Sequence, residues 1–127
     1  VCHIRSERGI PFTTFQTEST DGGYTWSQPR QLLPAHGGAP AHLLPHSSGV
    51  LISAYGYREK PYGIRLMLST DGGQTWQTDI PLWEGVSGDL GYPATVELTD
   101  GSLLTVFYAK DKPEGPAVIK QLKWQFA

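Results

Sequence analysis

The chain has 127 residues, the size of one ordinary domain, and 39% of them are hydrophobic. Its formal net charge of −2 and sequence pI near 6.1 provide no overall attraction to nucleic acid or to an anionic membrane surface. A single cysteine, Cys2, excludes an internal disulfide framework and a cysteine-based zinc site, and no apolar stretch is long enough for a membrane-spanning helix.

The sequence predicts an all-β protein made of short strands. The 15 glycines and 10 prolines are scattered without a regular period, as expected for many tight turns, and no segment shows sustained helical periodicity. Asp-Gly pairs between apolar runs favour hairpins. In chain order, the expected strands are 1–4, 40–45, 50–57, 63–69, 76–83, 93–98, 103–108 and 118–125.

The chain contains an internal repeat. Residues 19–26 (STDGGYTW) return as residues 69–76 (STDGGQTW), and an ungapped offset of 50 pairs Arg8 with Arg58 upstream of them. A second similarity relates residues 40–57 to residues 93–109. A period near 50 residues fits one four-stranded sheet per repeat, as in a β-propeller blade. The expected organisation is the end of one blade (1–36), a complete blade (37–86) and three strands of a last blade (87–127).

The repeated octapeptide resembles the Asp-box of sialidases (neuraminidases) and related BNR-repeat propellers. An aspartate in such a turn can accept backbone N–H bonds, the glycines can adopt positive φ, and the tryptophan can anchor the hairpin. A calcium loop would need further oxygen ligands and a terminal glutamate, so we expect a scaffold role with no metal or cofactor. The defining residues are Ser19, Asp21, Gly23, Trp26, Ser69, Asp71, Gly73 and Trp76. The resemblance implies about two and a half blades of a six-bladed propeller.

Two arginines are candidate ligands for a carboxylate. Arg8 and Arg58 fall in the loop between the second and third strands of adjacent blades, and arginine is well suited to bidentate carboxylate recognition. The resemblance implies that they are two of the three arginines that hold the sialic acid carboxylate. Arg5 and Arg65 are the candidates if the register shifts. The alternative is that each arginine pairs with a nearby surface glutamate.

Tyr92 is the candidate nucleophile. Its partner in the repeat is Ala39, so Tyr92 departs from the repeated pattern. Residues 91–98 resemble the segment that carries the catalytic tyrosine of sialidases. Pro93 follows it where many sialidases have serine. Asp89 and His36 lie in neighbouring loops as further candidate ligand contacts. The alternative for Tyr92 is a buried core tyrosine bonded to a carbonyl, and for Asp89 a loop-capping bond.

The leading hypothesis is therefore part of a sialidase-like exo-glycoside hydrolase that binds a sialylated or other acidic glycan. The alternatives are a non-catalytic carbohydrate-binding or scaffold propeller, and a propeller enzyme for another sugar acid, such as a polysaccharide lyase. The resemblance puts the catalytic acid and base upstream of residue 1, so the isolated chain is predicted to be inactive. Open blade edges predict self-association, and neither nucleic acid nor membrane is an expected partner.

Overall fold

The computed structural model describes residues 1–126, and all regular secondary structure in that range is β-strand, which confirms the all-β prediction. None of these residues forms a helix that could cross a membrane. The strands are β1 (Cys2–Ser6), β2 (Thr13–Thr17), β3 (Arg30–Gln31), β4 (Ala41–Pro45), β5 (Leu51–Tyr57), β6 (Gly63–Ser69), β7 (Gln77–Glu84), β8 (Gly91–Glu97), β9 (Leu103–Lys110) and β10 (Ala117–Trp124).

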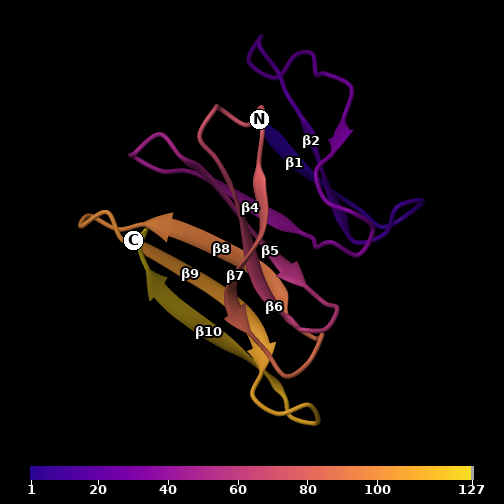
Figure 1. Cartoon of the computed structure of the whole chain (residues 1–127), viewed down its shortest axis with the longest axis vertical. Coiled ribbons are helices and arrows are strands. Elements are labelled where there is room, and N and C mark those ends of the chain that lie inside the picture. The colour runs from indigo at the N-terminus through magenta and orange to yellow at the C-terminus, as the bar shows by residue number, and fades with distance from the viewer. Residues whose placement is uncertain (127) are drawn as a thin grey trace.

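The strands form three antiparallel sheets in chain order. The first sheet has the order β1-β2-β3, the second β4-β5-β6-β7 and the third β10-β9-β8. Figure 1 shows the indigo first sheet at one end of the view and the orange-to-yellow third sheet at the other. Neighbours in the chain are thus neighbours in each sheet, as short hairpin connections dictate.

The second sheet is covered on both faces. In β5, Ile52 and Ala54 pack on Leu103 of the third sheet, whereas Tyr55 of the same strand packs on Leu33 from the first segment. Because successive side chains of a strand point to opposite faces, a strand sandwiched in this way is apolar almost throughout. This accounts for the nearly continuous burial of the sequence LISAYGY.

The register of the first sheet differs from that of the second. Thr14 and Ile64 are equivalent at the offset of 50, but Thr14 pairs with Arg5 whereas Ile64 pairs with Gly56. Arg5 therefore matches Gly56, an offset of 51. The prediction that the repeat continues upstream without a gap is therefore wrong for β1. The extra residue lies in the loop between β1 and β2, which also contains Arg8.

The two STDGG turns have the same internal hydrogen bonds. Asp71 accepts from the Thr75 amide (2.9 Å) and the Thr75 hydroxyl (2.5 Å), while the Gly73 amide donates to Ser69 Oγ (2.8 Å). Asp21 accepts from the corresponding groups of Thr25 at 2.9 and 2.5 Å. These bonds hold the pKa of each aspartate down, at about 2.

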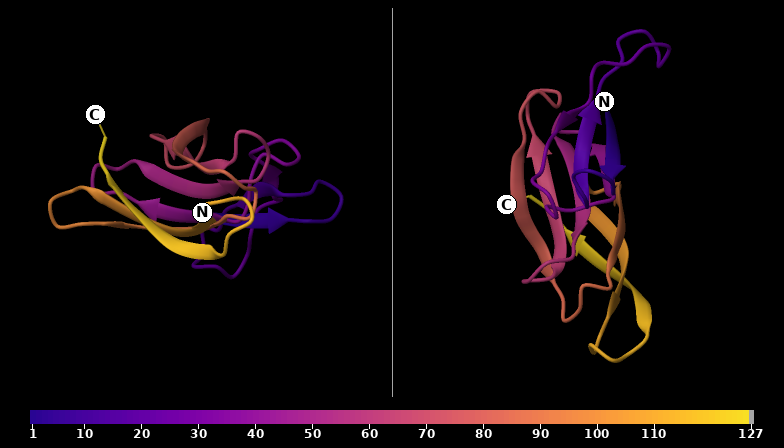
Figure 2. Two further views of the ribbon diagram at one scale, coloured as in Figure 1. Left: turned by 90° about the horizontal axis from the view of Figure 1, so that it is seen from below. Right: turned by 90° about the vertical axis from the view of Figure 1, so that its right-hand side faces the viewer.

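The surroundings of the two turns differ. Trp76 packs edge-on against His3 of the first sheet, with ring centroids 5.0 Å apart. Trp26 is 50% exposed and donates to the Gly23 carbonyl of its own turn. The purple segment that carries Trp26 projects from the body of the molecule (Figure 2). Among the described residues, Trp26 therefore has no neighbouring sheet comparable to the one that Trp76 contacts.

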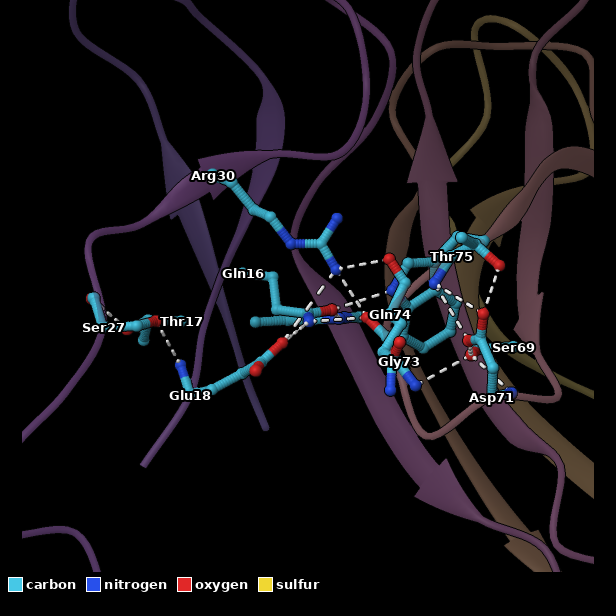
Figure 3. A network of polar contacts seen from close by, with 12 residues as sticks. Gln16, Thr17, Glu18, Ser27, Arg30, Ser69, Asp71, Gly73, Gln74 and Thr75 are labelled. Atoms are coloured by element: carbon cyan, nitrogen blue, oxygen red, sulfur yellow. Dashed lines mark hydrogen bonds and ion pairs between the residues drawn. The ribbon is translucent and has the colours of Figure 1, made fainter. Parts of the chain in front are cut away.

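A partly buried polar network joins the first two sheets (Figure 3). Gln16 donates to the Gly73 carbonyl (2.8 Å) and accepts from the Trp76 indole (2.8 Å). Arg30 donates to the same Gly73 carbonyl (2.5 Å) and to that of Gln74 (3.0 Å). The second STDGG turn is therefore bonded to the sheet before it as well as closed on itself.

Candidate functional site

Tyr92 stands at an irregular start of β8. Its φ is 51°, that of Gly91 is 138°, and the pairing with β9 shifts between Gly91 and Ala94. Positive φ is strained for a bulky residue, and such strain concentrates at functional sites. The side chain is 57% exposed. Tyr92 is thus not a buried core tyrosine.

Arg5 of the first sheet contacts Tyr92 of the third. Its Nη1 donates to the Tyr92 hydroxyl oxygen at 3.0 Å, and its Nη2 lies 2.9 Å from Oε1 of Glu7. Arg5 and His3 project to the same face of β1, and His3 contacts Ser53 in the second sheet, so this face points toward the rest of the molecule. The geometry therefore favours Arg5 over Arg8 as the arginine of this segment.

Arg58 approaches the same strand start from the loop after β5. A Cβ atom on Gly91 would lie 3.3 Å from Arg58 Nη2, a tight contact, and the φ of 138° at this residue favours glycine. Nη2 donates to the Tyr108 hydroxyl over a long 3.4 Å, and the buried Nε has no hydrogen-bond partner within residues 1–126. Arg58 has no ion pair within that range either. The guanidinium therefore has no acidic group paired directly with it among the described residues.

Tyr108 and Asp89 complete the surroundings of Arg58. Burial raises the pKa of Tyr108, the charge of Arg58 opposes that shift, and Asp89 adds to it. Asp89 also forms an ion pair with Lys110, 3.3 Å away. The predicted ligand contact Asp89 is therefore beside the cluster but is engaged by a lysine. Sequence reasoning missed Tyr108, whose position in a regular strand offers no signal.

Arg8 and Arg65 lie elsewhere. Arg8 is exposed in the turn between β1 and β2, where its carbonyl accepts from Ser6 Oγ and from the Ile10 amide. Arg65 pairs with Asp79 and lies over the Tyr57 ring, 3.5 Å from its centroid. Arg65 lies opposite Tyr55 and so faces the first sheet, away from Arg58. The structure does not bring either arginine to Tyr92.

A pocket of about 240 Å³ adjoins Arg58. Its lining consists of Phe12, His36, Gly38, Ala39, Gly56, Arg58 and Glu59. His36, a candidate ligand contact from the sequence, is at the rim, with Nδ1 3.6 Å from Glu59 Oε1. Within residues 1–126 no group of three or more His, Cys, Asp or Glu side chains is arranged to hold a metal ion. The functional groups gathered around Arg58 and this pocket are guanidinium groups, tyrosine phenols and the aromatic rings of Phe12 and His36.

Comparisons with known proteins place the chain in a family. The description "BNR repeat-like domain" matches residues 1–105. A crystal structure of a protein of unknown function from Dyadobacter fermentans is similar over 98% of this chain, with 27% identity and a TM-score of 0.80. The chain spans 34% of that protein. No curated protein matches. Given the match over most of its length, this chain belongs to the BNR repeat-like domain family.

Proposed function

We propose that this chain supplies the carboxylate-binding part of a sialidase-like site that takes a sialylated or otherwise acidic glycan. The observation that carries the proposal is Arg58, whose guanidinium has a buried, unpaired Nε and no acidic partner in residues 1–126. A partly buried cation without a counterion is costly unless a ligand supplies the anion. Membership of the BNR family supports the same reading of the STDGG turns as Asp-boxes in propeller blades.

Tyr92 is the proposed nucleophile for hydrolysis. Its exposed hydroxyl receives a hydrogen bond from Arg5, and this donor would orient the oxygen for attack on the anomeric carbon. The glycosidic bond to the leaving alcohol would break as the new bond forms, and a proton donor outside this chain would protonate that alcohol. Arg5 replaces Arg8 in the proposed carboxylate clamp with Arg58. Within the chain, Glu7 is paired with Arg5 and Asp89 with Lys110, so neither carboxyl is free to act as acid or base. We therefore expect the 127-residue chain to bind the acid sugar without cleaving it.

Binding of N-acetylneuraminic acid to the chain, followed by calorimetry or NMR titration, tests the proposal. Arg58→Met and Arg5→Met should each weaken binding about 10- to 100-fold, the usual effect of losing a charge-assisted hydrogen bond. The methyl ester of N-acetylneuraminic acid should bind to the wild type as weakly as the free acid binds to these variants. Because Arg58 Nε has no hydrogen-bond partner within residues 1–126, Arg58→Met should leave the melting temperature unchanged or raise it.

The matched control is Lys112→Met, which removes an exposed cation from the loop before β10 and should bind normally. If Arg8→Met weakened binding of N-acetylneuraminic acid more than Arg5→Met does, Arg8 and not Arg5 would be the second arginine that binds the carboxylate. No difference between the acid and its ester would reject carboxylate recognition. If the acid binds but a longer form of the protein containing this chain does not hydrolyse a fluorogenic sialoside, the non-catalytic binding alternative holds.

A further inference from the structure

The backbone strain of this protein gathers around Arg58. Four non-glycine residues in the described range have positive φ: Phe12 (48°), His36 (59°), Asp79 (66°) and Tyr92 (51°). Phe12 and His36 line the pocket that Arg58 also lines, and Tyr92 follows the glycine that Arg58 approaches. Left-handed conformations of bulky residues persist only where surrounding bonds over-determine them, and they concentrate at binding sites. Three of the four residues with positive φ therefore either line a pocket with Arg58 or follow the glycine that Arg58 approaches.

The pocket wall is held in place by the backbone. The His36 amide donates to the Pro11 carbonyl and the Gly38 amide donates to the Phe12 carbonyl, both at 2.8 Å. The buried hydroxyl of Thr14 donates to the Gly38 carbonyl at 3.0 Å. These bonds tie the loop before β2 to the loop before β4. The two aromatic rings of Phe12 and His36 are consequently fixed near each other, with centroids 5.9 Å apart and planes inclined by 33°.

Phe12 has no packing role that explains its position. It is 37% exposed, it belongs to none of the three hydrophobic clusters, and it lines the pocket beside Arg58. The floor of the pocket consists of Gly38, Ala39 and Gly56, which leave room above the sheet. At about 240 Å³ the pocket falls below the roughly 300–1,000 Å³ typical of sites for drug-sized ligands. It suits one small ring.

We propose that the Phe12–His36 pocket is a second subsite, which binds a neutral sugar ring linked to the acid sugar on Arg58. The apolar face of a pyranose would lie on the Phe12 ring, and its hydroxyl groups would meet the polar groups of His36 and Glu59 at the rim. This inference rests on the proposed function, because the acid sugar sets the position of its neighbour. The chain would then select a disaccharide or longer acidic glycan over the free acid sugar.

The test compares N-acetylneuraminic acid, lactose and sialyllactose as ligands of the 127-residue chain. Sialyllactose should bind about tenfold more tightly than the free acid, the gain expected from one aromatic contact, and lactose alone only weakly. Phe12→Asn should remove this gain while leaving affinity for the free acid within about twofold. Asparagine tolerates positive φ, so this substitution deletes the ring without forcing the backbone to change.

The control variant is Tyr24→Asn, which removes an aromatic ring that is 90% exposed in the first STDGG turn. It should bind all three sugars as the wild type does. A second measurement uses only the wild type, so it does not depend on a variant folding. In the NMR spectrum of bound sialyllactose, the protons of the neutral sugar should show ring-current shifts from the Phe12 ring.

The outcomes separate the two proposals. If the free acid does not bind, both the proposed function and this subsite fail. If the free acid binds but sialyllactose gains nothing, or Phe12→Asn weakens both ligands equally, only the subsite is overturned. Absence of ring-current shifts in bound sialyllactose would also overturn it.

Discussion

The orientation of the Gln16 side-chain amide determines which hydrogen bonds it forms and which nitrogen of His3 carries the proton. Its Nε2 donates to the Gly73 carbonyl and to Glu18, so its oxygen faces the Trp76 indole and His3 Nε2. His3 must then carry its proton on Nε2, and Nδ1 accepts from Ser53 Oγ at 2.9 Å. Burial lowers the pKa of His3, which favours the neutral ring that this arrangement needs.

Replacing this amide should destabilise the contact between the first two sheets. Gln16→Met preserves the volume but leaves the partners of the amide without their hydrogen bonds. The expected loss is about 2–3 kcal/mol in the free energy of unfolding, since an unsatisfied buried polar group costs about 1–3 kcal/mol. Urea denaturation followed by tryptophan fluorescence measures it.

The matched control for this substitution is Gln77→Met, at an exposed position of β7. Exposed substitutions usually change stability by less than about 0.5 kcal/mol. Equal effects of the two substitutions would show that the network of Figure 3 adds nothing to stability.

At the scale of the element, the STDGG turns are predicted to govern acid stability. Asp71 has a folded pKa of about 2 against an ordinary value of 3.8, because Thr75 and Ser69 donate to its ionised form. A lowered folded pKa means that its contribution is complete above about pH 4 and is lost as pH falls through about 2. The corresponding bonds at Asp21 have the same effect on its pKa.

Asp71→Asn should therefore be less stable than the wild type at pH 6, with the difference shrinking as the pH falls from about 4 toward 2. Urea midpoints at pH 6, 4 and 2.5 measure the change. Asp21→Asn should follow the same trend, since its pKa has the same causes. A deficit that stays constant across this pH range would mean that the variant acts through packing instead of charge.

The elements also show which features the sequence could predict. The 63–69 strand has the predicted limits in β6, because an apolar run between turn residues defines it. The two-residue β3 was not predicted, since only its pairing with β2 identifies it. Tyr92 was selected from a break in the repeat and Arg58 from its loop position. The structure places Arg58 beside Gly91, next to Tyr92, and the functional roles of both residues stay predictions. Arg5 was ranked below Arg8 because the ungapped repeat pairs Arg8 with Arg58. The contact of Arg5 with Tyr92 depends on how the first and third sheets lie together, which the repeat does not indicate.

At the scale of the whole molecule, the three sheets are unequal. The second has four strands. Within residues 1–126 the first has no counterpart of β4 beside β1, and the third has no counterpart of β7 beside β10. A free edge strand offers unpaired backbone N–H and C=O groups to another chain. β10 is one of the two longest edge strands, with eight residues from Ala117 to Trp124, as many as β7, and its Ile119 is 79% exposed.

We expect two copies of the chain to associate through an antiparallel pairing of their β10 strands, which a two-fold axis would make self-complementary. Light scattering after size exclusion should show a monomer at low concentration and a dimer at high concentration. Ile119→Lys should shift the equilibrium toward the monomer, because it places like charges across the pairing and removes apolar contact. Val86→Lys, at an exposed apolar residue outside the strands, is the matched control and should dimerise normally. A wild-type chain that stays monomeric at every concentration would exclude pairing at this edge, and the lysines already present on β10 would then be sufficient to block it.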